Sequence, residues 1–291
     1  MTIKEKGYTH WDGEFLNKKL SWLPITRYGI KLTFRKKFFK LLFFLALTPA
    51  VLFLAGIYVA ERMEDFKFMI SEGEMPDFLN IDPAYFKAYF TNDYMLFMMV
   101  MLLVFCGAGL ISDDLKFNSL QLYFSRPITK RDYFLGKASV IVFFLLIVTL
   151  LPGLVFILMK LVFSASFEFL SAYPLLPFSV IGYSLLVTIF FSFYGLFLSS
   201  VNKNRRYVAI LIFGLYIFSD VLYGIFYGIF RDEYFALLSI KENLKQAGAF
   251  LFDQKLPHDT PWFLSFVIIV GFCVLGAYVL KKKIRGVEVV K

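Results

Sequence analysis

The stretch Ser112–Lys137, SDDLKFNSLQLYFSRPITKRDYFLGK, is a polar segment between two long apolar runs. The run before it is YMLFMMVMLLVFCGAGLI (Tyr94–Ile111), and the run after it is ASVIVFFLLIVTLLPGLVFILM (Ala138–Met159). A helix needs about 20 apolar residues to cross the hydrocarbon core of a bilayer, so each run is long enough. The polar stretch therefore joins two membrane-spanning helices, and its own pattern predicts how that connection is built.

The first half of this connection has the pattern of a short amphipathic helix. We expect Ser112 to cap its N-terminus, because the acidic pair that follows would then lie in the first turn, near the positive helix end. Pro127 is expected to end this helix. Thr129 then begins the next one, with Asp132 three residues later, the spacing of a capping box. From these residues alone, an ordinary capped loop and a docking element for a partner are equally good interpretations.

An acidic pair, a short helix ending near a Ser and a Pro, basic residues, an aromatic residue and Gly-Lys follow one another in this stretch. The residues are Asp113, Asp114, Leu120, Ser125, Pro127, Arg131, Tyr133, Gly136 and Lys137. This order resembles the loop between the second and third spans of ABC-2-type transporter permeases, which often carry Glu at the acidic pair and Gly where this chain has Asn118. Six spans with the loop in this place are also that family's layout.

The resemblance implies that a coupling helix in this loop sits on a cytoplasmic ABC ATPase subunit and moves with it when ATP binds. It also implies a second permease copy, in a homodimer or heterodimer, with ATP and Mg²⁺ bound by the ATPase and no cofactor on this chain. The expected docking residues lie between positions 113 and 127: Asp113, Asp114, Lys116, Asn118, Leu120, Tyr123, Arg126 and Pro127.

The composition independently predicts an integral membrane protein. Of 291 residues, 59% are hydrophobic and 20% aromatic, more apolar surface in long runs than a soluble domain carries. The expected fold is all-α, with an N-terminal interfacial elbow helix, six transmembrane helices and a cytoplasmic coupling helix between spans 2 and 3. The expected spans are about 38–59, 94–111, 138–159, 178–198, 207–230 and 262–280.

The distribution of basic residues predicts the orientation. With both termini on one side, that side carries 23 of the 31 Lys and Arg residues and the other side carries eight. The positive-inside rule then places both termini and the 112–137 loop in the cytoplasm of a multi-pass protein of the plasma or inner membrane. Because topology and lipid contact account for the net charge of +9, we do not expect a nucleic-acid partner.

The chain divides into a cytoplasmic segment (1–37), a six-span domain (38–280) and a basic tail (281–291). Within the first segment, Pro24 is expected to open an amphipathic helix. Its basic face would carry Arg27, Lys31 and Arg35, and its apolar face Ile25, Tyr28 and Leu32. Such a helix would lie flat on the anionic lipids of one leaflet, although a solvated basic tail is the simpler alternative.

No set of residues predicts catalysis or metal binding. The sequence lacks a Gly-x-x-x-x-Gly-Lys-Ser/Thr phosphate loop, so we do not expect this chain to bind ATP itself. The two histidines, His10 and His258, fall on opposite sides of the membrane in this topology. The loop 231–261 is expected to contain a short surface helix, and the acidic loop 60–93 no separate domain.

Asp220, near the middle of the fifth span, is the one acidic residue within the expected spans. A carboxylate there costs about 3 kcal/mol, so it should face protein or water. Tyr216, Tyr223 and Tyr227 share its helix face. Either this stripe lines a transport path, or Asp220 is paired and holds helices together while Gly224-x-x-x-Gly228 allows close packing.

The function we predict is that of the permease subunit of an ABC transporter, coupling ATP hydrolysis by a separate subunit to transport, with export as the direction. Two alternatives remain open from the sequence. A non-transporting scaffold of a membrane complex would share every feature except ATPase contact. A membrane-embedded, lipid-modifying enzyme using Asp220 would need further ionisable groups at the same depth, which the spans lack.

Overall fold

The computed structural model describes residues 20–62, 81–124, 128–164 and 167–283, and all regular structure within these ranges is helical. Six segments are long and apolar enough to cross a membrane. They are Lys37–Glu61, Asp93–Lys116, Lys130–Ser164, Leu176–Val201, Arg205–Phe230 and Trp262–Lys283. The predicted all-α membrane architecture is therefore confirmed.

These segments correspond to α2 (Lys37–Glu61), α5 (Asp93–Gly107) with α6 (Gly109–Lys116), α8 (Lys130–Val148) with α9 (Leu150–Ser164), α11 (Leu176–Val201), α12 (Arg205–Phe230) and α14 (Trp262–Lys283). The shorter helices are α1 (Leu23–Phe34), α4 (Pro83–Thr91), α7 (Ser119–Phe124), α10 (Glu168–Ala172), the 3₁₀ helix η3 (Glu233–Leu238) and α13 (Ile240–Leu251). The third span is longer than expected, because the capping box of Thr129 and Asp132 starts α8 at Lys130.

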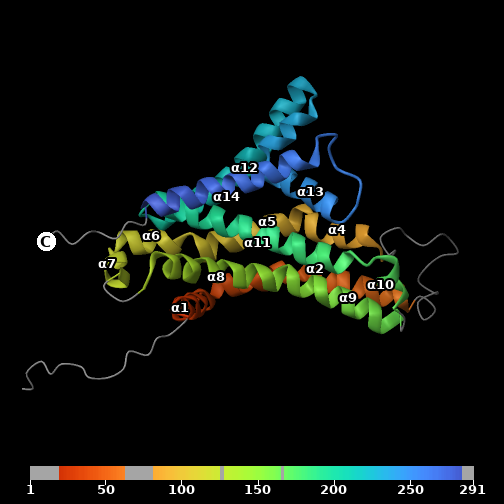
Figure 1. The fold of residues 1–291 in the computed structure, drawn as a ribbon, viewed down its shortest axis with the longest axis horizontal. Helices are drawn as coiled ribbons and strands as arrows, with labels where there is room; N and C mark the ends of the chain where they lie inside the picture. Colours follow the sequence, from red (N-terminus) through yellow and green to blue (C-terminus); the bar gives the residue numbers. More distant parts are fainter. Residues whose placement is uncertain (1–19, 63–80, 125–127, 165–166, 284–291) are drawn as a thin grey trace, which may run out of the picture.

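The long helices form one bundle, in which α5, α8, α9 and α11 run alongside one another and α12 and α14 lie on one flank (Figure 1). One end of the bundle carries α1, α7, the start of α8 and the last turn of α14, and we call it the basic end. At the other end, the opposite end, lie α4 and α10. α11 is central, since it packs against α5, α6, α8, α9, α12, α13 and α14.

The second span is interrupted at Ala108, between α5 and α6, and a serine of α11 stabilises the interruption. Ser199 Oγ accepts hydrogen bonds from the N–H groups of Ile111 (3.0 Å) and Ser112 (3.1 Å) and donates one to the carbonyl of Ala108 (2.9 Å). Ser112 is itself buried within α6 and donates to the Ala108 carbonyl at 2.7 Å. The prediction that Ser112 caps a new helix is therefore wrong, because the span continues to Lys116.

The predicted elbow helix is present as α1, with Pro24 in its first turn. It crosses α8 closely at two glycines. A Cβ on Gly29 would lie 2.5 Å from the Val140 side chain, and one on Gly136 would lie 2.8 Å from Cβ of Ile25. The Thr26 hydroxyl also donates to the Gly136 carbonyl at 3.1 Å. The face of α1 that packs on the protein is thus lined by small residues.

The polar and apolar faces of α1 differ in part from the prediction. Arg27, Lys31 and Arg35 are all exposed, as expected for a basic face. Of the predicted apolar face, only Ile25 is buried against the protein, and Tyr28 and Leu32 are exposed. The contact with α8 supplies the reason, because it uses the face centred on Thr26 and Gly29 and leaves Tyr28 and Leu32 pointing outward.

The loops of the opposite end are more ordered than the sequence indicated. Within the acidic loop, α4 is capped by Asp82, whose carboxylate accepts from the Tyr85 N–H at 3.0 Å, and it buries four aromatic side chains. α13 was predicted to be a surface helix, but it packs against α4, α11, α12 and α14, so most of it is buried. Residues 63–80 of the acidic loop lie outside the described residues.

Candidate functional site

The connection between the second and third spans is a sharp turn followed by a short helix. α6 ends at Lys116, Phe117 follows it, and Asn118 adopts a left-handed backbone conformation with φ of 53°. Asn tolerates this conformation better than most residues, so the turn to α7 forms here without a glycine. Lys116, Phe117 and Asn118 are exposed at the basic end, and the Phe117 side chain is 69% exposed. Phe117 was not among the predicted docking residues.

The acidic pair lies in the last turn of α6 and not at the start of a coupling helix. Carboxylates at a helix C-terminus are disfavoured by the helix dipole, so they need other partners. Asp114 has them. Its Oδ2 lies 2.6 Å from Lys137 Nζ and accepts a hydrogen bond of 2.6 Å from the Tyr133 hydroxyl. The Asp113 carboxylate and the Arg205 side chain both lie close to Gly109, because a Cβ added to this glycine would contact each of them.

Tyr123 of α7 joins this group of side chains. Its ring lies 5.2 Å from that of Tyr133, and Lys137 Nζ lies 5.5 Å from its centroid, a cation–π distance. Burial, and then the charge of Asp114, raise the pKa of the Tyr123 hydroxyl above its usual value. We call Asp114, Tyr123, Tyr133 and Lys137 the Asp114 cluster. It connects α6, α7 and α8, so these three helices are held together at the basic end.

The predicted docking residues thus fall into three groups. Lys116 and Asn118 face outward. Four residues are buried or half-buried in contacts within the chain: Asp113, Asp114, Leu120 and Tyr123. Arg126 and Pro127, with the neighbouring Ser125, lie outside the described residues. Three residues that carry the family resemblance also have contacts within the chain. The side chains of Tyr133 and Lys137 contact Asp114, and Gly136 allows the close approach of Ile25.

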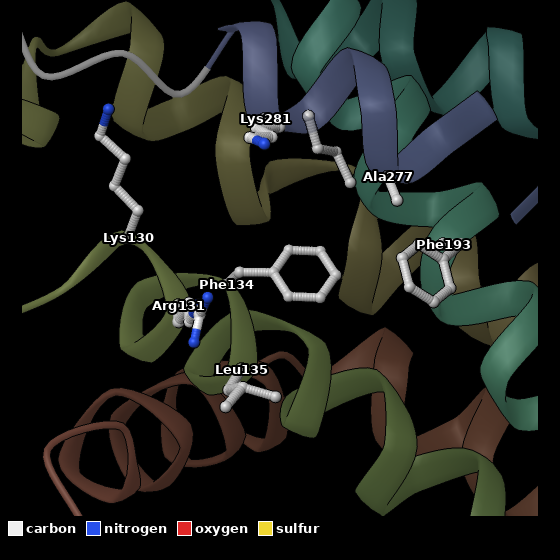
Figure 2. Close-up of a pocket in the computed structure, with 8 residues that line it drawn as sticks. Lys130, Arg131, Phe134, Leu135, Phe193, Ala277 and Lys281 are labelled. Atoms are coloured by element: carbon white, nitrogen blue, oxygen red, sulfur yellow. The ribbon is translucent and has the colours of Figure 1, made fainter. Parts of the chain in front are cut away.

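A second feature of the basic end is a cavity of about 370 Å³ between α8, α11 and α14 (Figure 2). Its walls include Phe134 and Phe193, whose ring centroids are 5.5 Å apart. Three cationic side chains, Lys130, Arg131 and Lys281, also line it. No local pattern in the sequence indicates this cavity, because its residues come from three separate spans.

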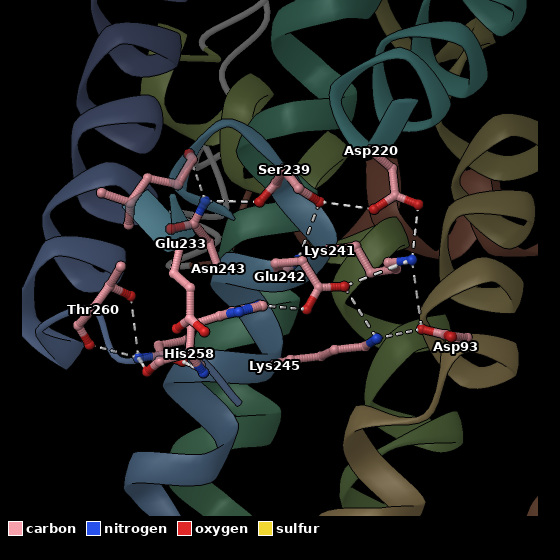
Figure 3. Close-up of polar contacts among 12 residues, drawn as sticks. Asp93, Asp220, Glu233, Ser239, Lys241, Glu242, Asn243, Lys245, His258 and Thr260 are labelled. Atoms are coloured by element: carbon pink, nitrogen blue, oxygen red, sulfur yellow. Dashed lines mark hydrogen bonds and ion pairs between the residues drawn. The ribbon is translucent and has the colours of Figure 1, made fainter. Parts of the chain in front are cut away.

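At the opposite end of the bundle, α13 brings charged side chains against Asp220 of α12 (Figure 3). Lys241 Nζ donates to Asp220 Oδ2 at 2.8 Å, and the Ser239 hydroxyl donates to Asp220 Oδ1 at 3.1 Å. Lys245 Nζ lies 2.6 Å from Asp93 Oδ1, at the first turn of α5. Asp220 is therefore paired, as the structural interpretation of this residue predicted.

Glu242 completes this network from the same helix. Its carboxylate contacts Lys245 Nζ at 3.2 Å and His258 Nε2 at 3.0 Å. We call Asp93, Asp220, Lys241, Glu242, Lys245 and His258 the ion cluster. Three carboxylates here face two ammonium groups and one imidazole, and they join α5, α12, α13 and the segment before α14. Within the described ranges, no group of three His, Cys, Asp or Glu side chains is placed to hold a metal ion.

The electrostatics of the ion cluster favour the charged forms of its members. Burial of Glu242 alone would raise its pKa, but the hydrogen bond to His258 and the charges of Lys245 and Lys241 outweigh it and lower the pKa to about 2. For Lys241, burial would lower the pKa, but the hydrogen bond and charge of Asp220, with further help from Asp93, raise it instead. The cluster therefore stabilises the packing of α13 as a set of ion pairs.

The tyrosines predicted to share a face with Asp220 lie on α12 with it, and their surroundings differ. Tyr216 is buried, and its hydroxyl has no hydrogen-bond partner among the described residues. The ring of Tyr223 lies 5.7 Å from that of His258 and 5.6 Å from that of Tyr227. Around Gly224 and Gly228, a Cβ would meet nothing within 4 Å, so these glycines do not pack closely within the chain.

Sequence reasoning missed most of the ion cluster, because it placed α13 on the surface. A signal was present in Ser239 followed by Glu242, which has the spacing of an N-cap and does form one, with the Glu242 N–H donating to Ser239 Oγ at 3.2 Å. The Glu242–Lys245 spacing also favours an ion pair on one helix face. Neither pattern reveals that the partner carboxylates, Asp93 and Asp220, lie on other spans.

Six membrane-length helices define a multi-pass, all-α membrane protein. The sequence matches the ABC-2 family transporter proteins over residues 30–284. The chain belongs to that family, which confirms the predicted membership of the ABC-2-type permeases. This family indicates a transport subunit, which in general associates with an ABC ATPase, and not an enzyme. Among curated proteins, none matches this chain in sequence.

Proposed function

We propose that this chain forms the membrane path of an ABC exporter, as one of two permease copies, each docked on a cytoplasmic ATPase that binds ATP and Mg²⁺. In this proposal the basic end faces the cytoplasm of a cell with this protein in its plasma or inner membrane, and both termini lie there. The excess of Lys and Arg at that end supports this orientation. The exposed face of α1, with Arg27, Lys31 and Arg35, then contacts anionic lipid headgroups.

The observation that carries the proposal is the turn at Phe117. In this proposal a docked ATPase covers Phe117, whose side chain is 69% exposed, together with the exposed Lys116 and Asn118 beside it. The turn is also firmly held, because the Asp114 cluster joins α6 and α7 to α8. A docked ATPase that moves this turn would therefore move two spans with it.

The second span gives a route from this turn to the ion cluster. Asp114 and Asp93 lie 21 residues apart on α5–α6, a helix distance of about 32 Å. One end of the span is joined to α8 through Lys137, and the other to α13 through Lys245. We infer that movement of the turn by ATP-driven closure of the ATPases changes the pairing of Asp93, and with it the position of α13 beside the tyrosine stripe of α12.

The test of docking compares two exposed phenylalanines. Phe117→Ala removes the aromatic side chain at the turn, and Phe167→Ala removes a 75% exposed one at the opposite end. In mild detergent, we expect the amount of ATPase that co-purifies with Phe117→Ala to be at least tenfold lower than with the wild type. Phe167→Ala should retain the wild-type amount. The ATPase used is the one encoded nearest this gene. Equal retention by both variants would contradict docking at this turn, and absence of an ATPase from the wild type would favour a scaffold.

The route along the second span has its own test. Asp93→Asn removes the carboxylate charge that faces Lys245 but lies far from the turn, so ATPase binding should be unchanged. Addition of a non-hydrolysable ATP analogue to the wild-type complex is expected to change hydrogen–deuterium exchange in α13. The Asp93→Asn complex should show at most half of that change. An equal change in both complexes would show that α13 does not respond through this ion pair.

A further inference from the structure

The cavity between α8, α11 and α14 has the composition of a binding site for an amphiphilic anion. It measures about 370 Å³, which is within the range of small-molecule sites in proteins, about 300–1,000 Å³. Its deeper part is apolar and contains the rings of Phe134 and Phe193 and the buried side chain of Leu280. The cavity lies at the flank of the bundle, since α14 is one of the two least buried spans.

Three cations lie at the same cavity and come from two different helices. Lys130 and Arg131 occupy the first turn of α8, and Lys281 lies in the last turn of α14. Figure 2 shows the Phe134 ring pointing across the gap toward Phe193, with Lys130, Arg131 and Lys281 nearer the helix ends. The polar and apolar parts are thus separated along the direction of the spans, as they are in a lipid molecule.

Among the residues that the structure describes, no acidic side chain lines this cavity to neutralise the three cations. Asp132 is adjacent in sequence, but its carboxylate is used in the capping box, where it accepts from the Thr129 N–H at 3.1 Å and the Thr129 hydroxyl at 2.8 Å. Arginine can bind a phosphate through two parallel hydrogen bonds, and the long side chains of lysine reach toward a membrane surface from an apolar base. The charge of the occupant is therefore negative.

We propose that this cavity binds one anionic phospholipid from the leaflet at the basic end. Its phosphate lies among Lys130, Arg131 and Lys281, and the first part of an acyl chain lies against the contacting rings of Phe134 and Phe193. Phe193 is eight residues before the end of α11, so the cavity extends about 12 Å along the span from that end. A basic pocket between transmembrane helices is the arrangement that recognises anionic lipid headgroups. A bound lipid would join α8, which carries the Asp114 cluster, to α14.

The test is native mass spectrometry of the purified, delipidated full-length protein, titrated with phosphatidylglycerol or phosphatidylcholine. We expect the wild type to bind one phosphatidylglycerol per chain at least tenfold more tightly than phosphatidylcholine. The variant Lys130→Gln/Arg131→Gln/Lys281→Gln should weaken phosphatidylglycerol binding at least tenfold. A matched variant, Lys40→Gln/Lys203→Gln/Arg206→Gln, neutralises three exposed cations near the same end and should stay within twofold of the wild type.

A second variant tests the apolar part without changing any charge. Ala277 also lines the cavity, and Ala277→Phe would fill part of it. We expect this variant to weaken phosphatidylglycerol binding at least tenfold while the cations remain. Equal losses in the two triple variants would show a general charge effect and overturn the site, as would wild-type binding by Ala277→Phe. If the cavity variants instead convert a dimer to monomers and leave lipid binding unchanged, a second chain covers this surface.

Discussion

Substitution of Asp114 by Asn separates the two roles that this residue can have. Asp114 was expected to contact an ATPase, but in the structure its Oδ2 lies 2.6 Å from Lys137 Nζ, and the two side chains are only 13% and 11% exposed. Asn keeps an oxygen that can accept from the Tyr133 hydroxyl, so the main loss is the charge that faces Lys137. The fold, and not a docking surface, should therefore respond first.

The magnitude follows from the burial of the pair. Removing one partner of a fully buried ion pair costs about 3–5 kcal/mol, because the other charge is left without compensation. Since Asp114 and Lys137 keep a little exposure, we expect the lower end for Asp114→Asn, about 3 kcal/mol of unfolding free energy. Lys137→Met should cost a similar amount. The double variant removes both charges and should cost about 2 kcal/mol less than the sum of the two single variants.

Unfolding in mixed micelles with increasing SDS measures these free energies, and co-purification measures ATPase binding on the same samples. The expected result is loss of stability in each single variant, partial recovery in the double variant, and ATPase retention that follows stability. A coupling energy near zero would refute the pairing of Asp114 with Lys137. Full stability with selective loss of the ATPase would show that Asp114 contacts the partner directly.

Three further predictions concern other parts of the fold. The folded-state pKa of Glu242 is lowered from 4.5 to about 2 and that of Lys241 is raised above 10.5, so the ion cluster should stabilise the protein fully between pH 4.5 and pH 10.5, the ordinary pKa values of the two groups. Glu242→Gln should therefore melt below the wild type at pH 7. The difference should shrink as pH falls from about 4.5 to about 2, because the carboxylate gains its proton first in the unfolded chain and only near pH 2 in the folded one; a constant difference would contradict this. Gly136→Val should displace α1 and cost about 1–3 kcal/mol in SDS unfolding, whereas Gly182→Ala, where a Cβ meets nothing within 4 Å, should change stability by less than about 1 kcal/mol. Ser199→Ala removes three hydrogen bonds at the α5–α6 interruption and should cost about 1–3 kcal/mol. Ser179→Ala removes a single solvent-exposed hydrogen bond on the same helix and should cost under about 1 kcal/mol.

Local sequence determined the class of the protein and much of its secondary structure. Six apolar runs specify six spans because insertion depends on the summed hydrophobicity of about 20 neighbouring residues. The capping box at Thr129 and Asp132 and the proline in the first turn of α1 are also local signals, and both helix starts are found in the structure. The family resemblance of the 112–137 stretch belongs with these, since it depends on the order of residues along one segment.

Only the tertiary structure decided what the polar residues do. Asp114 and Asp220 were recognised as unusual, but their partners Lys137 and Lys241 are 23 and 21 residues away, and Asp93 pairs with Lys245 across 152 residues. A charge that leaves water needs a compensating partner, and which one it takes depends on how the helices pack, not on sequence spacing. The cavity at the basic end has the same origin, because α8, α11 and α14 meet only in the folded bundle.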